Sequence, residues 1–171
     1  MVILKRLNMK LSSLLCCCKV AEDFTLQKMN YSGINLRIEG YFFREIEEDF
    51  YELFFLFEDG VFLSGGAMRV DGEEKTVDDS VLNFIELGYY KNNQYGWGIW
   101  IVENDQIVIE KWLPGSGGPY PVGRYVGEVL NDSTINIAFT YQLPPEGDEE
   151  KQQFTFREFS PKPDSTNTFI E

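Results

Sequence analysis

The chain has 171 residues, of which 28 are Asp or Glu and 15 are Lys or Arg, so its formal net charge is −13 at pH 7. Such an acidic chain lacks the concentrated positive surface that nucleic acid requires, so we expect no nucleic-acid partner. The sequence has no histidine, which excludes Ser-His-Asp and Cys-His catalysis within this chain. No apolar run reaches the roughly 18 residues of a membrane span, so membrane contact is expected only through an N-terminal lipid anchor.

The first 30 residues are expected to form a leader and linker that precede the folded domain. Three basic residues come before a short apolar stretch that ends in the three cysteines of the chain, Cys16, Cys17 and Cys18. This order resembles a bacterial lipoprotein signal, in which one cysteine becomes the lipidated N-terminus, and it implies location at the cell envelope. The alternative is an uncleaved leader on a cytoplasmic protein. Because all three cysteines lie here, the domain is expected to need no disulfide.

Three strands are expected at the start of the domain. Apolar and polar residues alternate over residues 34–43, which is typical of a half-buried strand. Residues 49–58 form a second expected strand, and the Asp-Gly pair that follows is a tight-turn signal leading into a third strand over 61–64. The paired glycines at 65–66 are expected to end that strand.

Residues 71–87 have the least strand-like pattern. Thr76 is suited to cap a short helix, because apolar residues recur at helical spacing after it. We expect this helix to run into a strand over residues 84–91. The alternative is that residues 83–90 form one more strand.

A central hairpin is predicted around Asn104-Asp105, which separates two runs rich in Trp, Ile and Val. A two-residue turn with positive φ fits this pair and places Ile99 opposite Glu110. Both faces of the hairpin are then apolar, so either another element covers the second face or the sheet closes on itself. One face carries Trp97, Ile99, Ile101, Val108, Glu110 and Trp112, and the other carries Gly96, Gly98, Trp100, Val102, Ile107, Ile109 and Lys111.

A second hairpin is predicted from residues 123–130 and 134–141. A three-residue loop pairs Phe139 with Tyr125 and keeps the apolar side chains on one face, whereas a two-residue loop would separate them. A last strand is expected over residues 152–159.

These elements predict an all-β domain over residues 31–160, followed by an extended C-terminal tail over residues 161–171. Eight or nine antiparallel strands, joined mostly to their neighbours, are expected to close into an up-and-down barrel with a short helix. A two-sheet β-sandwich is the alternative.

Four motifs of the C-terminal half point to a relative. They are Glu-Lys-Trp-Leu-Pro over residues 110–114, Ser-Gly-Gly-Pro over 116–119, Leu-Asn-Asp over 130–132, and the segment over 159–167. Together they resemble an uncharacterised family of small bacterial proteins, many with lipoprotein signals. The resemblance implies no activity.

A more distant resemblance concerns the fold. Gly40-Tyr41-Phe42 lies on the first expected strand and Arg157 on the last. This pattern resembles the lipocalin and calycin barrels, which carry Gly-x-Trp on the first strand and a late Arg that packs on the Trp. Phe42 stands where those barrels have Trp, so the resemblance implies a fold and no function.

Aromatic side chains of consecutive strands are the candidate ligand site. Trp97, Trp112, Tyr125 and Phe139 are expected to face one way, and Glu110 among them is a candidate for orienting the polar end of a ligand. The alternative for Glu110 is contact with water or with an Arg. The alternative for the aromatic side chains is that they fill the barrel interior and leave no cavity.

We therefore expect a β-barrel protein that binds a small hydrophobic ligand at the cell envelope. The alternative is a surface-tethered structural or protein-interaction module with a filled core, for which the sequence names no protein partner. An enzyme is not expected, because no pair of carboxylates is singled out by position for acid–base chemistry. No cofactor is expected, and no metal site either, since the acidic clusters lack the spacing of a calcium loop.

Overall fold

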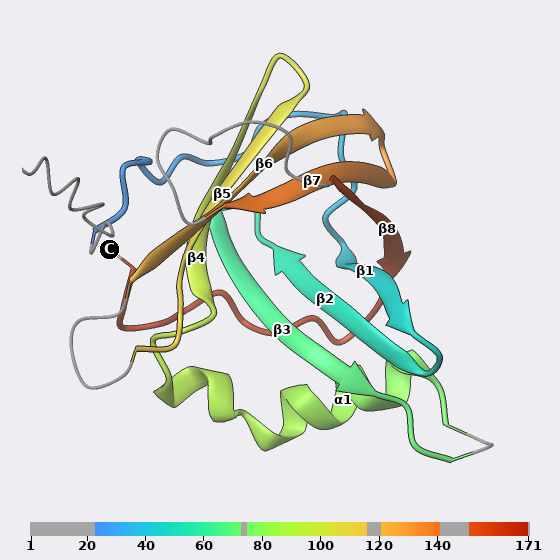
Figure 1. Ribbon diagram of the computed structural model, residues 1–171. Coiled ribbons are helices and arrows are strands. Elements are labelled where there is room, and N and C mark those ends of the chain that lie inside the picture. Colours follow the sequence, from blue (N-terminus) through green and yellow to red (C-terminus); the bar gives the residue numbers. More distant parts are fainter. Residues whose placement is uncertain (1–22, 73–74, 116–120, 141–150, 171) are drawn as a thin grey trace, which may run out of the picture.

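The computed structural model describes residues 23–72, 75–115, 121–140 and 151–170, and Figure 1 shows a strongly curved sheet with one longer helix beside it. The sheet is a closed antiparallel barrel in which each strand pairs with the next along the chain and the last pairs with the first. This confirms the predicted up-and-down barrel of eight or nine strands, with eight observed, rather than the two-sheet sandwich. The strands are β1 (Gly40–Glu47), β2 (Phe50–Leu56), β3 (Val61–Arg69), β4 (Trp97–Glu103), β5 (Gln106–Trp112), β6 (Val122–Asn131), β7 (Thr134–Thr140) and β8 (Gln152–Glu158).

The helix between β3 and β4 is the one predicted from Thr76. Helix α1 spans Val77–Leu87, and Thr76 caps it through a reciprocal pair of hydrogen bonds with Asp79. The strand predicted over residues 84–91 is wrong. Gly88 ends α1 with a φ of 62°, and the chain turns directly into a 3₁₀ helix, η1, over Tyr89–Asn92.

The two predicted hairpins form with the predicted registers. Asn104 and Asp105 have φ of 50° and 63°, and β4 pairs with β5 so that Ile99 lies opposite Glu110. In the second hairpin Tyr125 lies opposite Phe139. The turn residues set these registers locally, which is why the sequence was sufficient to place them.

Strand boundaries near β1 and β3 differ from the prediction. β1 begins at Gly40, because the residues before it cross one end of the barrel instead of extending the strand. β3 continues through its two glycines to Arg69. Gly66 has a φ of 75°, and the pairing of β2 with β3 shifts register at this level, so the glycines accommodate a bulge instead of ending the strand.

The barrel interior is packed with apolar side chains contributed by all eight strands. The rings of Phe54 and Phe154 lie 5.0 Å apart although β1 separates their strands, which shows that they meet across the interior. Aromatic filling of this kind leaves little empty space. The buried members are Leu36, Phe42, Phe54, Leu56, Phe62, Trp100, Ile107, Ile109, Ile135, Ile137, Phe154 and Phe156.

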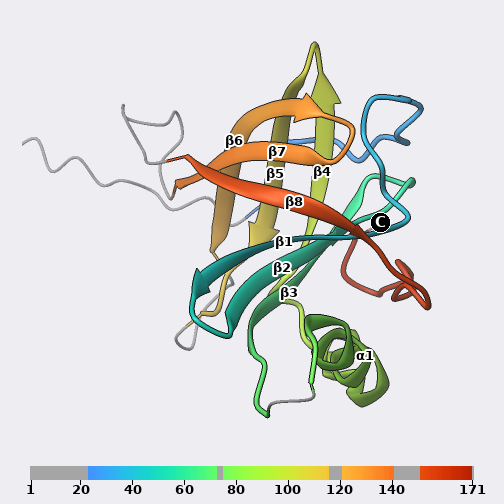
Figure 2. The ribbon, with the colours of Figure 1, turned by 90° about the vertical axis from the view of Figure 1, so that its right-hand side faces the viewer.

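A second apolar cluster lies on the outside of the barrel, beneath α1 and η1. Figure 2 shows α1 beside β3, and the ring of Phe84 on α1 stacks 6.3 Å from that of Phe55 on β2. Trp97 belongs to this cluster and donates its Nε1–H to the carbonyl of Tyr90 over 2.8 Å. The buried members are Tyr41, Leu53, Phe55, Phe57, Val61, Leu63, Val77, Val81, Tyr90, Trp97, Trp112 and Val122.

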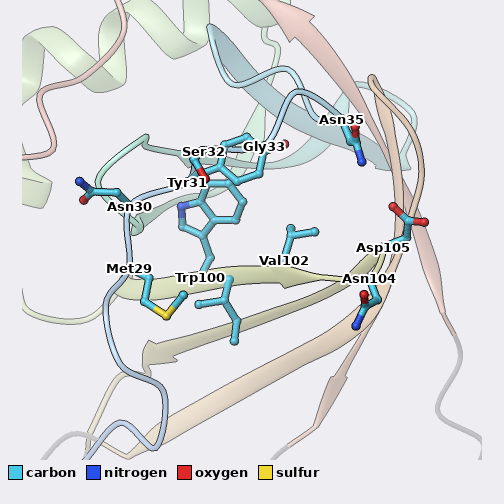
Figure 3. Close-up of a pocket in the computed structure, with 11 residues that line it drawn as sticks. Met29, Asn30, Tyr31, Ser32, Gly33, Asn35, Trp100, Val102, Asn104 and Asp105 are labelled. Carbon is cyan, nitrogen blue, oxygen red and sulfur yellow. The ribbon is translucent and has the colours of Figure 1, made fainter.

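One end of the barrel, which we call the Tyr31 end, is closed by the segment before β1. Tyr31 donates its N–H to the carbonyl of Glu58 over 2.7 Å, and Arg37 donates to the carbonyl of Asp132 over 2.8 Å. The segment therefore crosses from the β2–β3 turn to the β6–β7 turn. The Tyr31 ring lies 4.9 Å from that of Trp100, so it forms the cover of the interior cluster (Figure 3).

The C-terminal segment packs against the barrel without forming a helix or strand over residues 159–170. Lys162 donates hydrogen bonds of 2.6 Å to the carbonyls of Ile38 and Leu56, and Ser165 donates to Asp59 over 3.1 Å. These bonds hold the segment beside the Tyr31 end. Among the described residues, no helix is both long enough and apolar enough to span a membrane.

Candidate functional site

The opposite end of the barrel, which we call the Lys111 end, has a polar interior. The guanidinium of Arg44 on β1 lies 2.7 Å from the carboxylate of Glu52 on β2 and 5.5 Å from the ring centre of Phe154. Lys111 on β5 places its Nζ 3.4 Å from Ser64 Oγ on β3 and 5.2 Å from the ring centre of Tyr125. Charged side chains therefore point inward at this end, whereas the Tyr31 end is filled with rings.

A pocket of about 410 Å³ opens through the barrel wall beside Lys111. It lies between the middle of β3, the helical connection and the end of β5. Its described lining is mainly aromatic, with glycine backbone on one side, and Lys111 is the one charged residue among the described lining residues. The lining residues are Ser64, Gly65, Gly66, Phe84, Tyr89, Tyr90, Asn93, Tyr95, Gly96, Lys111, Trp112 and Pro114.

The pocket exists because β3 and β4 pair over only a short length. Their ladder holds three residue pairs and ends at Leu63 and Trp97. One further bond joins the N–H of Ser64 to the carbonyl of Gly96 over 2.8 Å. Beyond it β3 pairs only with β2, since the chain between β3 and β4 leaves the sheet to form α1 and η1. Glycine at Gly96, with a φ of 92°, allows the backbone to return to the sheet and leaves the wall without a side chain there.

Among the described residues, the inward-facing charged side chains of the Lys111 end are Arg44, Glu52 and Lys111, and their charges sum to one positive charge. Arg44 and Glu52 form an ion pair with both side chains about four-fifths buried, at 21% and 23% exposure, which leaves Lys111 as the additional cation. Burial lowers the pKa of the Lys111 amine from its ordinary value, and the charge of Glu52 opposes that shift. A buried ammonium is costly unless an anion or several acceptors surround it.

Trp112 is the one predicted ligand-site residue that lines this pocket. Its other side is covered by Phe24, whose ring centre lies 4.2 Å from that of Trp112. Trp97 does not line the pocket. It is fully buried beneath η1, and its indole N–H is already bonded to the carbonyl of Tyr90. Trp97 therefore supports the wall of the pocket from outside.

Glu110 has no exposed surface and serves the N-terminal segment. Its carboxylate accepts hydrogen bonds from the backbone of Thr25 and Leu26 at 2.7 and 2.9 Å and from the Thr25 hydroxyl at 2.5 Å. The guanidinium of Arg124 lies 3.6 Å away. Pairing with an Arg was one of the alternatives for Glu110, and the structure adds the second partner, the segment before β1.

The expectation that Tyr125 shares a face with Trp97 and Trp112 is wrong. Tyr125 lies opposite Ile109, which points into the barrel, whereas Glu110 and Trp112 point outward. Phe139 is paired with Tyr125 through the backbone, and its side chain lies outside the described part of the chain. The predicted set thus divides between the two faces of the sheet.

A second pocket, of about 500 Å³, lies at the Tyr31 end between the segment over residues 29–35 and the tip of the β4–β5 hairpin. In Figure 3 the side chains of Asn104 and Asp105 border it, and Trp100 lies at its inner side. Trp100 is 1% exposed and donates its indole N–H to the Phe57 carbonyl over 3.0 Å. This pocket has polar side chains at its rim, and the described residues of its lining include no Lys or Arg.

Sequence reasoning did not single out Lys111 or Ser64. The signal was present for Lys111, because it ends the inward-facing series Ile107, Ile109, Lys111, in which a charge is unexpected. Ser64 could not be identified as a site residue from the sequence, since its approach to Lys111 depends on the β3–β4 ladder ending at Leu63 and Trp97. In the described ranges, no three or more acidic or cysteine side chains are grouped in a way that could hold a metal ion.

The three candidate lipidation sites, Cys16, Cys17 and Cys18, lie outside the described residues, so lipidation stays a prediction. The resemblance to lipocalins and to a small lipoprotein-like family also stays a prediction. In the structure Arg157 lies opposite Tyr41 and binds Asp78 on α1 over 2.8 Å. Comparison with known protein families, curated proteins and solved structures finds no match for this chain.

Proposed function

We propose that this β-barrel protein binds a small, mainly hydrophobic molecule in the pocket beside Lys111. The observation that carries the proposal is the pocket itself: about 410 Å³, walled by aromatic rings and glycine backbone, in a barrel whose other end is filled and closed. Its volume lies in the usual range of small-molecule sites, about 300–1,000 Å³. The ligand would enter through the barrel wall instead of filling the barrel interior.

The aromatic rim offers a direct test. Tyr89 and Tyr95 line the pocket and are 68% and 45% exposed, so replacing them by Ala should leave the fold intact. Titration with an uncharged fluorescent dye such as N-phenyl-1-naphthylamine should show saturable binding to the wild type and at least about tenfold weaker binding to Y89A/Y95A. Leu130→Ala removes an equally exposed apolar side chain far from the pocket and should bind like the wild type. No saturable binding to the wild type would reject the proposal.

Location at the cell envelope is part of the proposal. The ring of Phe24 contacts that of Trp112, so the N-terminal segment meets the barrel beside the pocket. Phe24 follows Cys18 by six positions, and an extended chain spans at most about 3.6 Å per residue, so a lipid on Cys18 would hold the pocket within about 20 Å of the membrane. Radioactive palmitate should label the wild type and leave a C16S/C17S/C18S variant unlabelled. An unlabelled wild type would reject the anchor.

The alternative function is a tethered protein-interaction module. Exposed apolar side chains at the Tyr31 end favour it, with Ile34 at 95%, Met29 at 54% and Leu130 at 50% exposure. Capture of envelope proteins by the wild-type domain, lost in Ile34→Asp and kept in Y89A/Y95A, would favour this alternative over ligand binding.

A further inference from the structure

The geometry points to a specific class of ligand: we infer that the pocket takes a molecule with an apolar body and a single anionic head, and that the Lys111 ammonium binds the head. The inference rests on the proposed ligand-binding function and deepens it. Three features of the Lys111 end carry it, namely the position of the ammonium, the charges around it and the shape of the pocket.

The Lys111 side chain is turned inward by strand alternation. Ile107 and Ile109 on the same strand are fully buried in the barrel interior, and Lys111 continues their face. Lys111 nevertheless lines the pocket, and the described contacts of its Nζ are the Ser64 hydroxyl at 3.4 Å and the ring of Tyr125 at 5.2 Å. The hydroxyl bond is long and the ring offers no lone pair, so the ammonium keeps capacity for an anionic acceptor.

The nearby charges favour one added anion. Among the described residues, Glu52 acts on Lys111 through its charge and Tyr125 through its ring, and Arg44 already binds Glu52 through bonds of 2.7 and 2.8 Å. Arg44, Glu52 and Lys111 together carry one net positive charge, in a chain whose formal charge is −13. A monoanion would neutralise that charge. A polyphosphate would meet Glu52 and the acidic chain around it, so nucleotides are disfavoured.

The rest of the pocket wall indicates the shape and polarity of the ligand's body. Phe84, Tyr90 and Trp112 present ring surface, and Gly65 and Gly66 let a flat or extended body approach the backbone. Fatty acids and aromatic carboxylates or sulfonates share this chemistry. The pocket at the Tyr31 end has no cation among its described lining residues and does not fit the same class.

Two dyes with one skeleton separate head recognition from binding of the body. 1-Anilinonaphthalene-8-sulfonate carries a sulfonate, and N-phenyl-1-naphthylamine is its uncharged counterpart. Both would be titrated into wild type, Lys111→Met, Lys111→Arg and, as a control, Lys75→Met, which removes an exposed lysine outside this pocket. Met matches the length and apolar stem of Lys, so the K111M fold should be kept.

We expect the wild type to bind the sulfonate at least about tenfold tighter than the neutral dye, which corresponds to roughly 1.4 kcal/mol. K111M should lose this preference and keep its affinity for the neutral dye within about threefold. K111R and K75M should keep the preference. In the wild type the preference should also fall as pH rises and the Lys111 amine loses its proton, since the sulfonate stays ionised.

Equal affinity of K111M and wild type for the sulfonate, or a wild-type preference that does not change between pH 6 and 11, would overturn the anionic-head inference. The proposed function would still stand if the neutral dye bound. If the wild type bound neither dye, the proposed function itself would fall. The pH series uses wild-type protein only, so it decides the question even if K111M unfolds.

Discussion

Thr25 donates two hydrogen bonds to the carboxylate of Glu110, from its N–H over 2.7 Å and from its hydroxyl over 2.5 Å, across 85 positions of the chain. The pair fixes the N-terminal segment on the outer wall of β5. From there the segment reaches Tyr31, which covers the barrel end. The segment before β1 is therefore part of the folded barrel, and one buried carboxylate holds it there.

Glu110→Gln should destabilise the protein by about 2–4 kcal/mol, because it removes the negative charge that faces Arg124 and turns an acceptor oxygen into a donor. Urea unfolding followed by tryptophan fluorescence would measure the free energy of unfolding. Glu103→Gln, at an exposed position of the same hairpin, should change it by less than about 0.5 kcal/mol. Equal effects of the two substitutions would contradict the anchoring role of Glu110.

Asp78 should be needed to keep α1 on the barrel. It accepts hydrogen bonds from the Tyr41 hydroxyl over 2.5 Å and from Arg157 over 2.8 Å. Burial, and then the bond to Asp78, raises the pKa of Tyr41, so its hydroxyl remains a donor at ordinary pH. We expect Asp78→Asn to cost about 1–3 kcal/mol and to speed amide exchange in α1.

The control for Asp78 is Asp71→Asn, which breaks an exposed ion pair with Arg69 and should change stability by less than about 1 kcal/mol. Exchange in α1 that is as slow in Asp78→Asn as in the wild type would show that the apolar contacts alone hold the helix.

Lys162 should make stability depend on pH. Burial lowers the pKa of its amine to about 8, from 10.5 when unfolded. Between these values the unfolded chain binds more protons, so the Lys162 contribution to the free energy of unfolding rises with pH and levels off below about 8. Relative to Lys162→Met, the wild type should gain about 2 kcal/mol between pH 8 and 9.5. A constant difference across this range would mean that the pKa of Lys162 is not lowered in the folded state.

Gly98 should not tolerate a side chain. A Cβ there would lie 2.1 Å from the carbonyl oxygen of Glu110, which is backbone and cannot move aside. Gly98→Ala should therefore cost more than about 3 kcal/mol or prevent folding. At Gly66 nothing lies within 4 Å of the added atom, and only the positive φ is strained, so Gly66→Ala should cost about 1 kcal/mol. Thermal unfolding of the two variants compares them directly, and the reverse order would contradict this packing.

Local signals in the sequence were sufficient to predict the two hairpins and the residue at which the helix begins. Asn104-Asp105 and the three-residue loop after β6 each set a register, and Thr76 with Asp79 forms the predicted cap. The site was harder to predict. Alternation divides β5 into two faces, but it does not say which face is inside. Glu110 lies on the outer face and is nevertheless buried, because the segment with Thr25 binds its carboxylate.

Local sequence signals could not predict that Tyr125 and Trp112 lie on opposite faces of the sheet, for a different reason. The connection between β5 and β6 covers residues 113–121, which is too long for a two-residue turn to set the register. The observed register places Trp112 opposite Val122, which turns Tyr125 to the interior. The Lys111 pocket likewise depends on where the β3–β4 ladder ends, and no sequence pattern near Ser64 predicts that position.

The three tryptophans allow the most direct test of ligand binding. Trp112 lines the pocket beside Lys111, Trp100 lines the pocket at the Tyr31 end, and Trp97 lines neither. Proton–nitrogen NMR resolves their indole N–H signals, and single Trp→Phe variants assign them. On titration with 1-anilinonaphthalene-8-sulfonate, we predict that the Trp112 signal shifts to saturation while those of Trp97 and Trp100 stay nearly fixed. A shift confined to Trp100, or no shift at all, would contradict a ligand site beside Lys111.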